Sequence, residues 1–118
     1  AHPNLFLFRA KGLFEPWQLH PASPISLDAR YARNAGPLLE LKGQLYRPSQ
    51  DLTGLYGRQM HFHRIVRLNP REYVEEIAGQ RSVSPGWPKA VIGTHTYAST
   101  SKWEATDGYF LGLPPDYE

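Results

Sequence analysis

The stretch "YRPSQDLTGLYGR", residues 46–58, concentrates side chains that hydrogen-bond polar ligands. Arg47, Gln50 and Asp51 lie within five positions of one another. Because Pro48 has no amide proton to give to a strand ladder, we expect the chain to leave regular pairing there and to expose the residues that follow. Arginine, glutamine and aspartate at a strand end suit sugar hydroxyls. A turn whose polar groups satisfy one another would explain the same residues.

A second stretch, "LDARYARNAG" (27–36), places the carboxylate of Asp28 close to the guanidinium groups of Arg30 and Arg33. The planar fork of arginine suits carboxylates, phosphates and sugar hydroxyls. Ion pairing of Asp28 with its own neighbours is the alternative. Together with Asp51, Asp28 is our candidate for acid–base chemistry on a sugar bond, which needs two carboxyl groups roughly 5 to 9 Å apart.

Three histidines form a third candidate site. His61 and His63, in "HFHR", point to the same side of a predicted strand, and His95, in "GTHT", could join them. Imidazole pairs of this kind start zinc, copper and iron sites when a further ligand arrives from elsewhere. The alternative is that two half-exposed histidines bind nothing.

The elements that must position these residues are short strands. A chain of 118 residues with eleven prolines, ten glycines and many aromatic residues is typical of one all-β domain over residues 1–118. About seven strands are predicted from alternating apolar residues and turn signals. They fall at 4–10, at Trp17–Leu19, in a hairpin over 38–47 around Lys42 and Gly43, at 58–68, and in two strands within 90–110 joined by a turn at 99–102.

The segment "NPREYVEEIAG" (69–79) allows two readings. Asn69 as N-cap, Pro70 at the first helical position and Glu72 in a capping box predict a helix. A turn at Asn69 and Pro70 followed by a strand, with Tyr73 and Glu75 on one side, fits the same residues.

Composition also excludes several classes of function. The net charge is only +2 and the thirteen basic residues are scattered, so nucleic acid is not an expected partner. Cysteine is absent, which excludes disulfides and thiolate chemistry and leaves the compartment open. No apolar stretch reaches the roughly 20 residues of a membrane span, so we expect a soluble chain.

Several blocks in order resemble a known family. They are "LFEPWQLHPASPISLDARYARNAG", "GQLYRPSQDLTGLYGR", "IVRLNPREYVEE" and "IGTHTYASTSKWEATDGY". These blocks are similar to the C-terminal part of a five-bladed β-propeller family related to the N-terminal domain of glucosamine inositolphosphorylceramide transferase. The similarity extends from about Leu5 to Tyr109. The chain departs from the family pattern at Glu15, where glycine is usual, and at Ser23, where asparagine is usual.

The resemblance implies a propeller like those of furanosidase-like glycoside hydrolases, with a polar funnel that faces a carbohydrate and no cofactor. It implies Asp51 or Asp28 as acid or base if there is turnover. The residues implied to contact the carbohydrate are Arg30, Arg33, Arg47, Gln50, Tyr56 and His95. Further positions of the family pattern are Gly36, Gly57 and Asp107.

The length predicts one full blade, from about Ala35 to Ile77, with a half blade on either side. Such a piece exposes sheet edges, so we expect homo-oligomerisation, pairing with a missing N-terminal part, or closure into a compact β-sandwich or jelly roll. The leading hypothesis is a carbohydrate-acting or carbohydrate-binding protein. The alternatives are a small metal-dependent oxidoreductase that uses His61, His63 and His95, and a non-catalytic assembly module.

Overall fold

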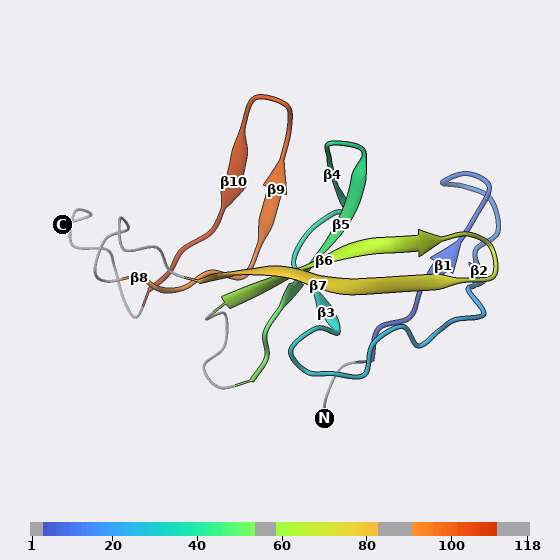
Figure 1. Ribbon diagram of the computed structural model, residues 1–118, viewed down its shortest axis with the longest axis horizontal. Coiled ribbons are helices and arrows are strands. Elements are labelled where there is room, and N and C mark those ends of the chain that lie inside the picture. The colour runs from blue at the N-terminus through green and yellow to red at the C-terminus, as the bar shows by residue number, and fades with distance from the viewer. Residues whose placement is uncertain (1–3, 54–58, 83–90, 111–118) are drawn as a thin grey trace.

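The fold is all-β, as predicted. The computed structural model describes residues 4–53, 59–82 and 91–110, and within these ranges every regular element is a short antiparallel strand. No helix occurs in the described ranges, so none there could cross a membrane. The β-strands group into one larger sheet and three separate two-stranded ladders (Figure 1).

The larger sheet is an antiparallel meander. Its strands are β3 (Arg33–Asn34), β4 (Leu39–Leu41), β5 (Gln44–Gln50), β6 (Gln59–Leu68) and β7 (Tyr73–Ser82). Of these, β4, β5, β6 and β7 pair in chain order, and β3 also pairs with β5. Both β3 and β4 pair with β5 at successive positions, so they form two parts of one interrupted edge. The sheet therefore has four rows, and β3 and β4 share the first of them.

The hairpin between β4 and β5 turns where the sequence indicated. Lys42 and Gly43 both have positive φ, 51° and 76°, and Leu41 pairs with Gln44 across the turn. Two successive positive φ values fit a type I′ turn, whose twist matches that of the strands it joins. The predicted hairpin is confirmed.

Pro48 lies inside β5, and the expectation that the chain leaves regular pairing there was wrong. It is the cross-strand partner of Phe62, and its carbonyl oxygen accepts a hydrogen bond from the amide of Ala35 at 3.0 Å. The nitrogen and oxygen of one strand residue point to the same neighbour. The side of Pro48 that lacks an amide proton therefore faces the break between β3 and β4. The β5–β6 ladder loses no hydrogen bond.

The segment after Asn69 is a turn followed by a strand, so the helix reading was wrong. The Asn69 side-chain oxygen accepts hydrogen bonds from the amides of Arg71 and Glu72, both at 2.9 Å. These are the bonds that an N-cap would make. Here they close a tight turn, and residues 73–82 then pair with β6 along nearly their whole length.

Three small ladders flank the meander. Their strands are β1 (Phe8–Arg9) with β2 (Gln18–Leu19), β8 (Val91–Gly93) with β11 (Tyr109–Phe110), and β9 (Tyr97–Ser99) with β10 (Glu104–Thr106). β9 meets the interrupted edge, because the Tyr97 amide donates to the Ala35 carbonyl at 2.8 Å. The chain at Gly36 has φ of 141°, and any side chain there would collide with the Tyr97 carbonyl oxygen, so only glycine fits.

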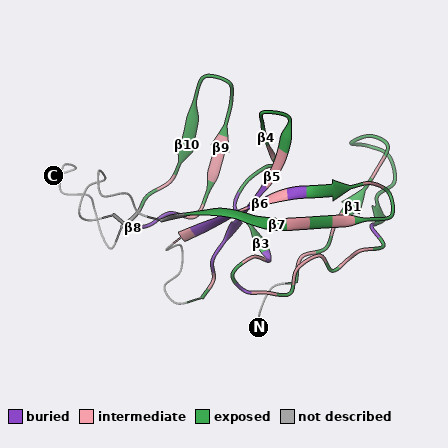
Figure 2. Cartoon of the chain, viewed as in Figure 1, coloured by how far each residue is buried: buried purple, intermediate pink, exposed green. Residues whose placement is uncertain are grey.

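The core of the described residues is small and mainly polar. Its buried apolar residues are three alanines, Met60 and Ile65. More polar than apolar residues are buried, and most of these polar residues lie in β5 and β6, where Figure 2 shows the buried positions of the meander. A buried polar group is stable only when it is hydrogen-bonded. The arrangement of these polar groups is therefore what fixes the fold.

Candidate functional site

The strand register brings the residues singled out in the sequence onto one face of the meander. Arg47 lies opposite His63, and Ser49 lies opposite His61. We call the following residues the polar cluster: Arg47, Ser49, Asp51, His61, His63, Tyr73 and Glu75. The segment 29–32 covers them, with the Tyr31 ring edge-on to both imidazoles at centroid distances of 5.0 and 5.1 Å.

Asp51 is buried and receives four hydrogen bonds. One carboxylate oxygen accepts from the amide and the hydroxyl of Thr53 at 2.8 and 2.5 Å. The other lies 2.9 Å from Gln59 Nε2 and 2.9 Å from His61 Nε2. Burial alone would raise the pKa of Asp51, but the bonds from Thr53, His61 and Gln59 hold that pKa at about 2. Asp51 is therefore ionised at neutral pH, and its carboxylate holds Thr53, Gln59 and His61 together.

Arg47 is buried and forms an ion pair with the partly buried Glu75. The guanidinium donates to both Glu75 oxygens, at 2.9 and 2.6 Å, and to the Asn34 side-chain oxygen at 3.0 Å. The Tyr73 hydroxyl also donates to Glu75 at 2.5 Å. Burial would raise the pKa of Glu75, but Arg47 and Tyr73 lower it below its usual range. The pair links the interrupted edge of the sheet to β7 on the far side.

Ser49 and His63 resemble two members of a serine triad without being one. Ser49 Oγ lies 2.8 Å from His63 Nε2, but the other imidazole nitrogen is 3.6 Å from Glu75, too far for a hydrogen bond. Ser49 is fully buried. Burial, followed by the nearby Arg47 charge, lowers the pKa of His63 to about 4, so the ring is neutral at physiological pH. No nucleophile is presented to a substrate here.

An exposed ion pair lies directly over the polar cluster. Arg30 donates from Nε and Nη2 to the two oxygens of Asp28, at 3.0 and 2.6 Å, and its guanidinium carbon is 4.7 Å from the Tyr31 ring centroid. The hydrogen bonds from Arg30 lower the pKa of Asp28 to about 2. We call Asp28, Arg30 and Tyr31 the surface triplet.

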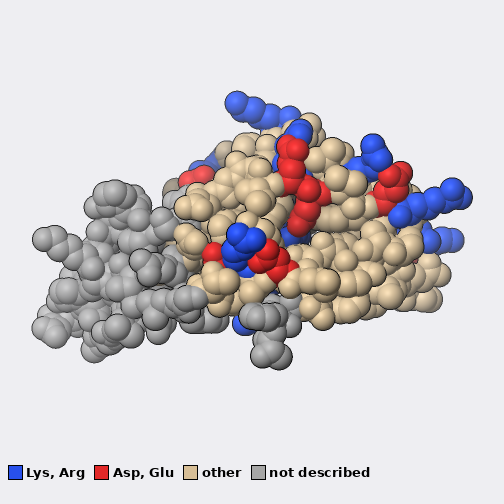
Figure 3. Space-filling model, turned by 60° about the horizontal axis from the view of Figure 1, so that its bottom comes forward, with Lys and Arg blue, Asp and Glu red and all other residues tan. Residues whose placement is uncertain are grey.

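Charged side chains of both signs occur on the face of the molecule drawn in Figure 3. In Figure 3 acidic and basic side chains lie beside one another on the part of the face that the structure describes. Exposed pairs at Arg64 with Glu76 and at Arg67 with Glu72 follow the same pattern.

Gln50 and Arg33 lie on the opposite face of the meander from the polar cluster. They are cross-strand partners in the β3–β5 pair. Gln50 is buried and its Nε2 donates to the Asn34 carbonyl at 3.2 Å, while its side-chain oxygen has no hydrogen-bond partner among the residues described. Arg33 is exposed. Tyr56 and Gly57 lie outside the described residues.

His95 pairs with a different acid from the other two histidines. Its Nδ1 forms an ion pair with Asp107, and Asp107 Oδ1 accepts the amides of His95 and Thr96, both at 2.9 Å. Burial would raise the pKa of Asp107, but these bonds lower it. Within residues 4–53, 59–82 and 91–110, no group of three or more histidine or acidic side chains is placed to hold a metal ion.

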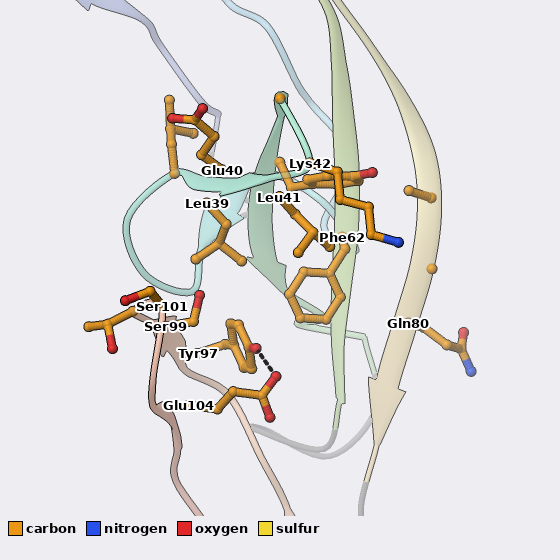
Figure 4. Close-up of a pocket in the computed structure, with 16 residues that line it drawn as sticks. Leu39, Glu40, Leu41, Lys42, Phe62, Gln80, Tyr97, Ser99, Ser101 and Glu104 are labelled. Atoms are coloured by element: carbon orange, nitrogen blue, oxygen red, sulfur yellow. Dashed lines mark hydrogen bonds between the residues drawn. The ribbon is translucent and has the colours of Figure 1, made fainter.

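The opposite face of the meander carries an open groove of about 940 Å³ (Figure 4). Phe62 and Tyr97 meet edge-to-face at its base, with ring centroids 5.4 Å apart, and the Tyr97 hydroxyl donates to Glu104 at 2.6 Å. The β4–β5 hairpin and the β9–β10 hairpin form its walls. No local pattern predicts this groove, because its walls come from segments about 60 residues apart in the chain.

Most residues of the polar cluster were singled out in the sequence, but their contacts with one another were not predicted. The residues singled out are Arg47, Asp51, His61 and His63, which the structure brings together. Tyr73 and Glu75 were not predicted as partners, nor Tyr31 as the covering ring. The signal was present in "YVE": Tyr73 and Glu75 are two apart and so share a face once the segment is a strand.

The fold and the site together define an all-β module with a buried network of ion pairs and imidazoles beneath an exposed arginine–aspartate pair. The chain belongs to the family of the N-terminal domain of glucosamine inositolphosphorylceramide transferase 1, whose family model matches residues 2–87. This match includes the whole polar cluster and the surface triplet.

Two curated rice proteins are similar to part of the chain. Both are described as glucosamine inositolphosphorylceramide transferase 1, one from Oryza sativa subsp. indica and one from subsp. japonica. Each is 44% identical over 62 residues, which is 51% of this chain and 8% of the rice protein. The chain therefore spans less than a tenth of these relatives. No solved structure matches it significantly.

Proposed function

We propose that this chain contributes a carbohydrate-binding surface to a protein that handles glycoconjugates, and that the surface triplet contacts the sugar. The observation that carries the proposal is the Arg30–Asp28 pair, exposed and stacked on Tyr31 above a buried polar cluster. Sugars are held by bidentate polar groups beside an aromatic ring. The relatives' description names an amino sugar and an inositol phosphate lipid, which fits this class of ligand.

The roles of the remaining candidates follow from their burial or from the family pattern. Arg33, Tyr56 and His95 are kept as proposed contact residues by the family pattern alone, since Arg33 lies on the face of the meander opposite the polar cluster. Arg47, Gln50 and Asp51 are buried. We assign them to holding the segment 28–34 in place, since the Leu52 amide donates to the Ala29 carbonyl at 3.0 Å next to Asp51. A rigid support of this kind reduces the entropy lost when a ligand binds.

Binding is better supported than proton transfer. A general acid for glycoside hydrolysis needs a carboxyl pKa raised toward neutral pH. The pKa values of Asp28 and Asp51 are both lowered, to about 2, so both candidates are anions at physiological pH. The proposal needs no cofactor. It treats the meander as one blade of a five-bladed propeller that is completed by other copies or by other parts of a longer chain.

Calorimetric titration of the chain with glucosamine, N-acetylglucosamine, galactose and inositol phosphate tests the proposal. We expect at least one to bind, and Arg30→Ala to weaken that binding about tenfold or more, since a lost charge-assisted pair costs at least about 1.4 kcal/mol. Arg67→Ala is the matched control, because Arg67 forms an equally exposed ion pair with Glu72.

The Arg67 variant should bind as the unchanged chain does. Equal losses in the two variants would show that Arg30 has no specific role. Absence of binding to every sugar in the panel would overturn the proposed function.

A further inference from the structure

The turn between β1 and β2 presents two large apolar side chains to solvent. The Glu15 amide donates to the Gly12 carbonyl at 3.1 Å, so Leu13 and Phe14 occupy the two central positions of a tight turn. Leu13 is 72% exposed and Phe14 is 97% exposed. Glycine, asparagine, aspartate and proline are usual at such positions. Nothing in the local backbone requires an apolar residue at either one.

More exposed apolar surface continues from this turn along the ladder. Phe8 and Leu19 are cross-strand partners and both are exposed, as is Trp17 just before β2. A contiguous exposed apolar surface on a small domain marks an interaction site. The two turn residues are its outermost part.

We call the turn at Leu13 and Phe14 the β1–β2 tip. The other end of this ladder is attached to the rest of the protein through His20. His20, which follows β2, is buried; its Nε2 lies 2.7 Å from the Asn69 carbonyl oxygen, and its Nδ1 accepts the Ala22 amide at 3.0 Å. The His20 amide donates to the Leu7 carbonyl at 2.8 Å. The ladder is thus tied to the turn between β6 and β7.

Basic side chains lie on the β1–β2 segment and on the β6–β7 turn, which contacts the base of the ladder through His20. Arg9 and Lys11 lie in the β1–β2 segment, and Arg67 and Arg71 lie around the β6–β7 turn, all exposed. Figure 1 shows both turns at the same end of the molecule, and Figure 3 shows basic side chains projecting from that end. The acidic residues of these two segments are Glu15 and Glu72, so the four cations outnumber them.

We infer that the β1–β2 tip inserts into the headgroup region of an anionic lipid bilayer. Leu13 and Phe14 enter the boundary between headgroups and acyl chains, Trp17 lies at the interface, and Arg9 and Lys11 contact lipid phosphates. Apolar residues flanked by cations, with a tryptophan at the polar boundary, are the composition that interfacial segments use. A convex tip needs no shape-matched pocket in a fluid bilayer, whereas a protein partner would have to supply one.

Co-sedimentation of the chain with phosphatidylcholine vesicles, with and without phosphatidylserine, tests this inference. We expect sedimentation with the anionic vesicles. The double variant Leu13→Ser and Phe14→Ser should lower the partition coefficient about tenfold or more, from the lost transfer of two apolar side chains. Lys11→Ala should give a smaller loss that vanishes at high salt.

The matched control is the double variant Leu41→Ser and Trp103→Ser. These two side chains are similarly exposed, on the β4–β5 and β9–β10 hairpins. The control should bind vesicles as the unchanged chain does, and thermal unfolding should show that both double variants stay folded.

Equal losses in the two double variants, or no binding to anionic vesicles, would overturn the inference. Self-association in solution that the Leu13 and Phe14 substitutions abolish would also overturn it, because the tip would then dock on a second copy.

Discussion

Charged side chains are largely buried on one face of the meander and exposed on the other. On one face Arg47 is buried and Glu75 is partly buried, and Tyr31 of the segment 29–32 packs against the neighbouring His63. On the other face Arg64 and Glu76, from β6 and β7, form an exposed pair, and the nearby groove is lined by apolar, polar and charged side chains together. The same residue types are therefore structural on one face and solvated on the other.

This difference changes how polar motifs are interpreted. Arg47, Gln50 and Asp51 first suggest a ligand site because they are polar and close in sequence. All three are buried, and the hydrogen bonds of Arg47 and Asp51 are made within the protein. Ligand contact is instead assigned to the side chains that the covering segment exposes. Burial separates the residues that support a site from those that touch its ligand.

The largest expected effect comes from breaking the Arg47–Glu75 pair. Arg47→Ala leaves the partly buried Glu75 carboxylate without its cation, and we expect the free energy of unfolding to fall by about 3–5 kcal/mol. Chemical denaturation followed by circular dichroism measures this loss. Arg64→Ala removes an arginine from the exposed pair on the other face and should cost no more than about 1 kcal/mol.

A similar, small loss in both variants would show that the Arg47–Glu75 pair is as well solvated as the exposed one. The contrast between the two faces would then fail.

A smaller effect is expected from acid, through His63. Unfolded histidine takes up a proton below a pKa of about 6.5, whereas in the folded chain the pKa of His63 is lowered to about 4 by burial and by Arg47. The contribution of His63 to the free energy of unfolding should therefore be constant above pH 6.5, fall as the pH drops from 6.5 to 4, and level off below pH 4. The loss is at most about 3 kcal/mol.

The matched variant is His63→Gln, which keeps a hydrogen-bonding group for Ser49 and removes the titration. Its unfolding free energy should depend less on pH between 4 and 6.5. An unchanged slope in this variant would assign the acid sensitivity to other groups. The stability that ionised Asp51 contributes should be lost at lower pH, between the usual pKa of Asp51, 3.8, and its pKa of about 2 in the folded chain.

Local patterns in the sequence predicted much of the fold. The Lys42–Gly43 turn and the alternation over 59–68 gave the β4–β5 hairpin and β6. The segment after Asn69 could not be decided locally. Its side chain makes the same two hydrogen bonds in a turn as in a helix cap, and only pairing with β6 selects the strand.

The site was less predictable because its partners are far apart in the chain. The residues of the Arg47–Glu75 pair are 28 positions apart, and those of the Ser49–His63 contact are 14 apart. The sequence identifies such groups as polar, but it does not show that they form hydrogen bonds with one another. The prediction that regular pairing ends at Pro48 was wrong for a related reason. The side of Pro48 without an amide donor faces a break in the edge strand, and no local pattern shows that break.

The central claim is that the surface triplet, over the polar cluster, is the ligand-facing side of the module. Nuclear magnetic resonance mapping of backbone amide shifts, with the sugar that binds in the calorimetric panel, tests it most directly. We predict the largest shifts in residues 28–33. Shifts confined to the walls of the groove, at 38–43 and 97–104, would place the ligand on the other face and contradict the account.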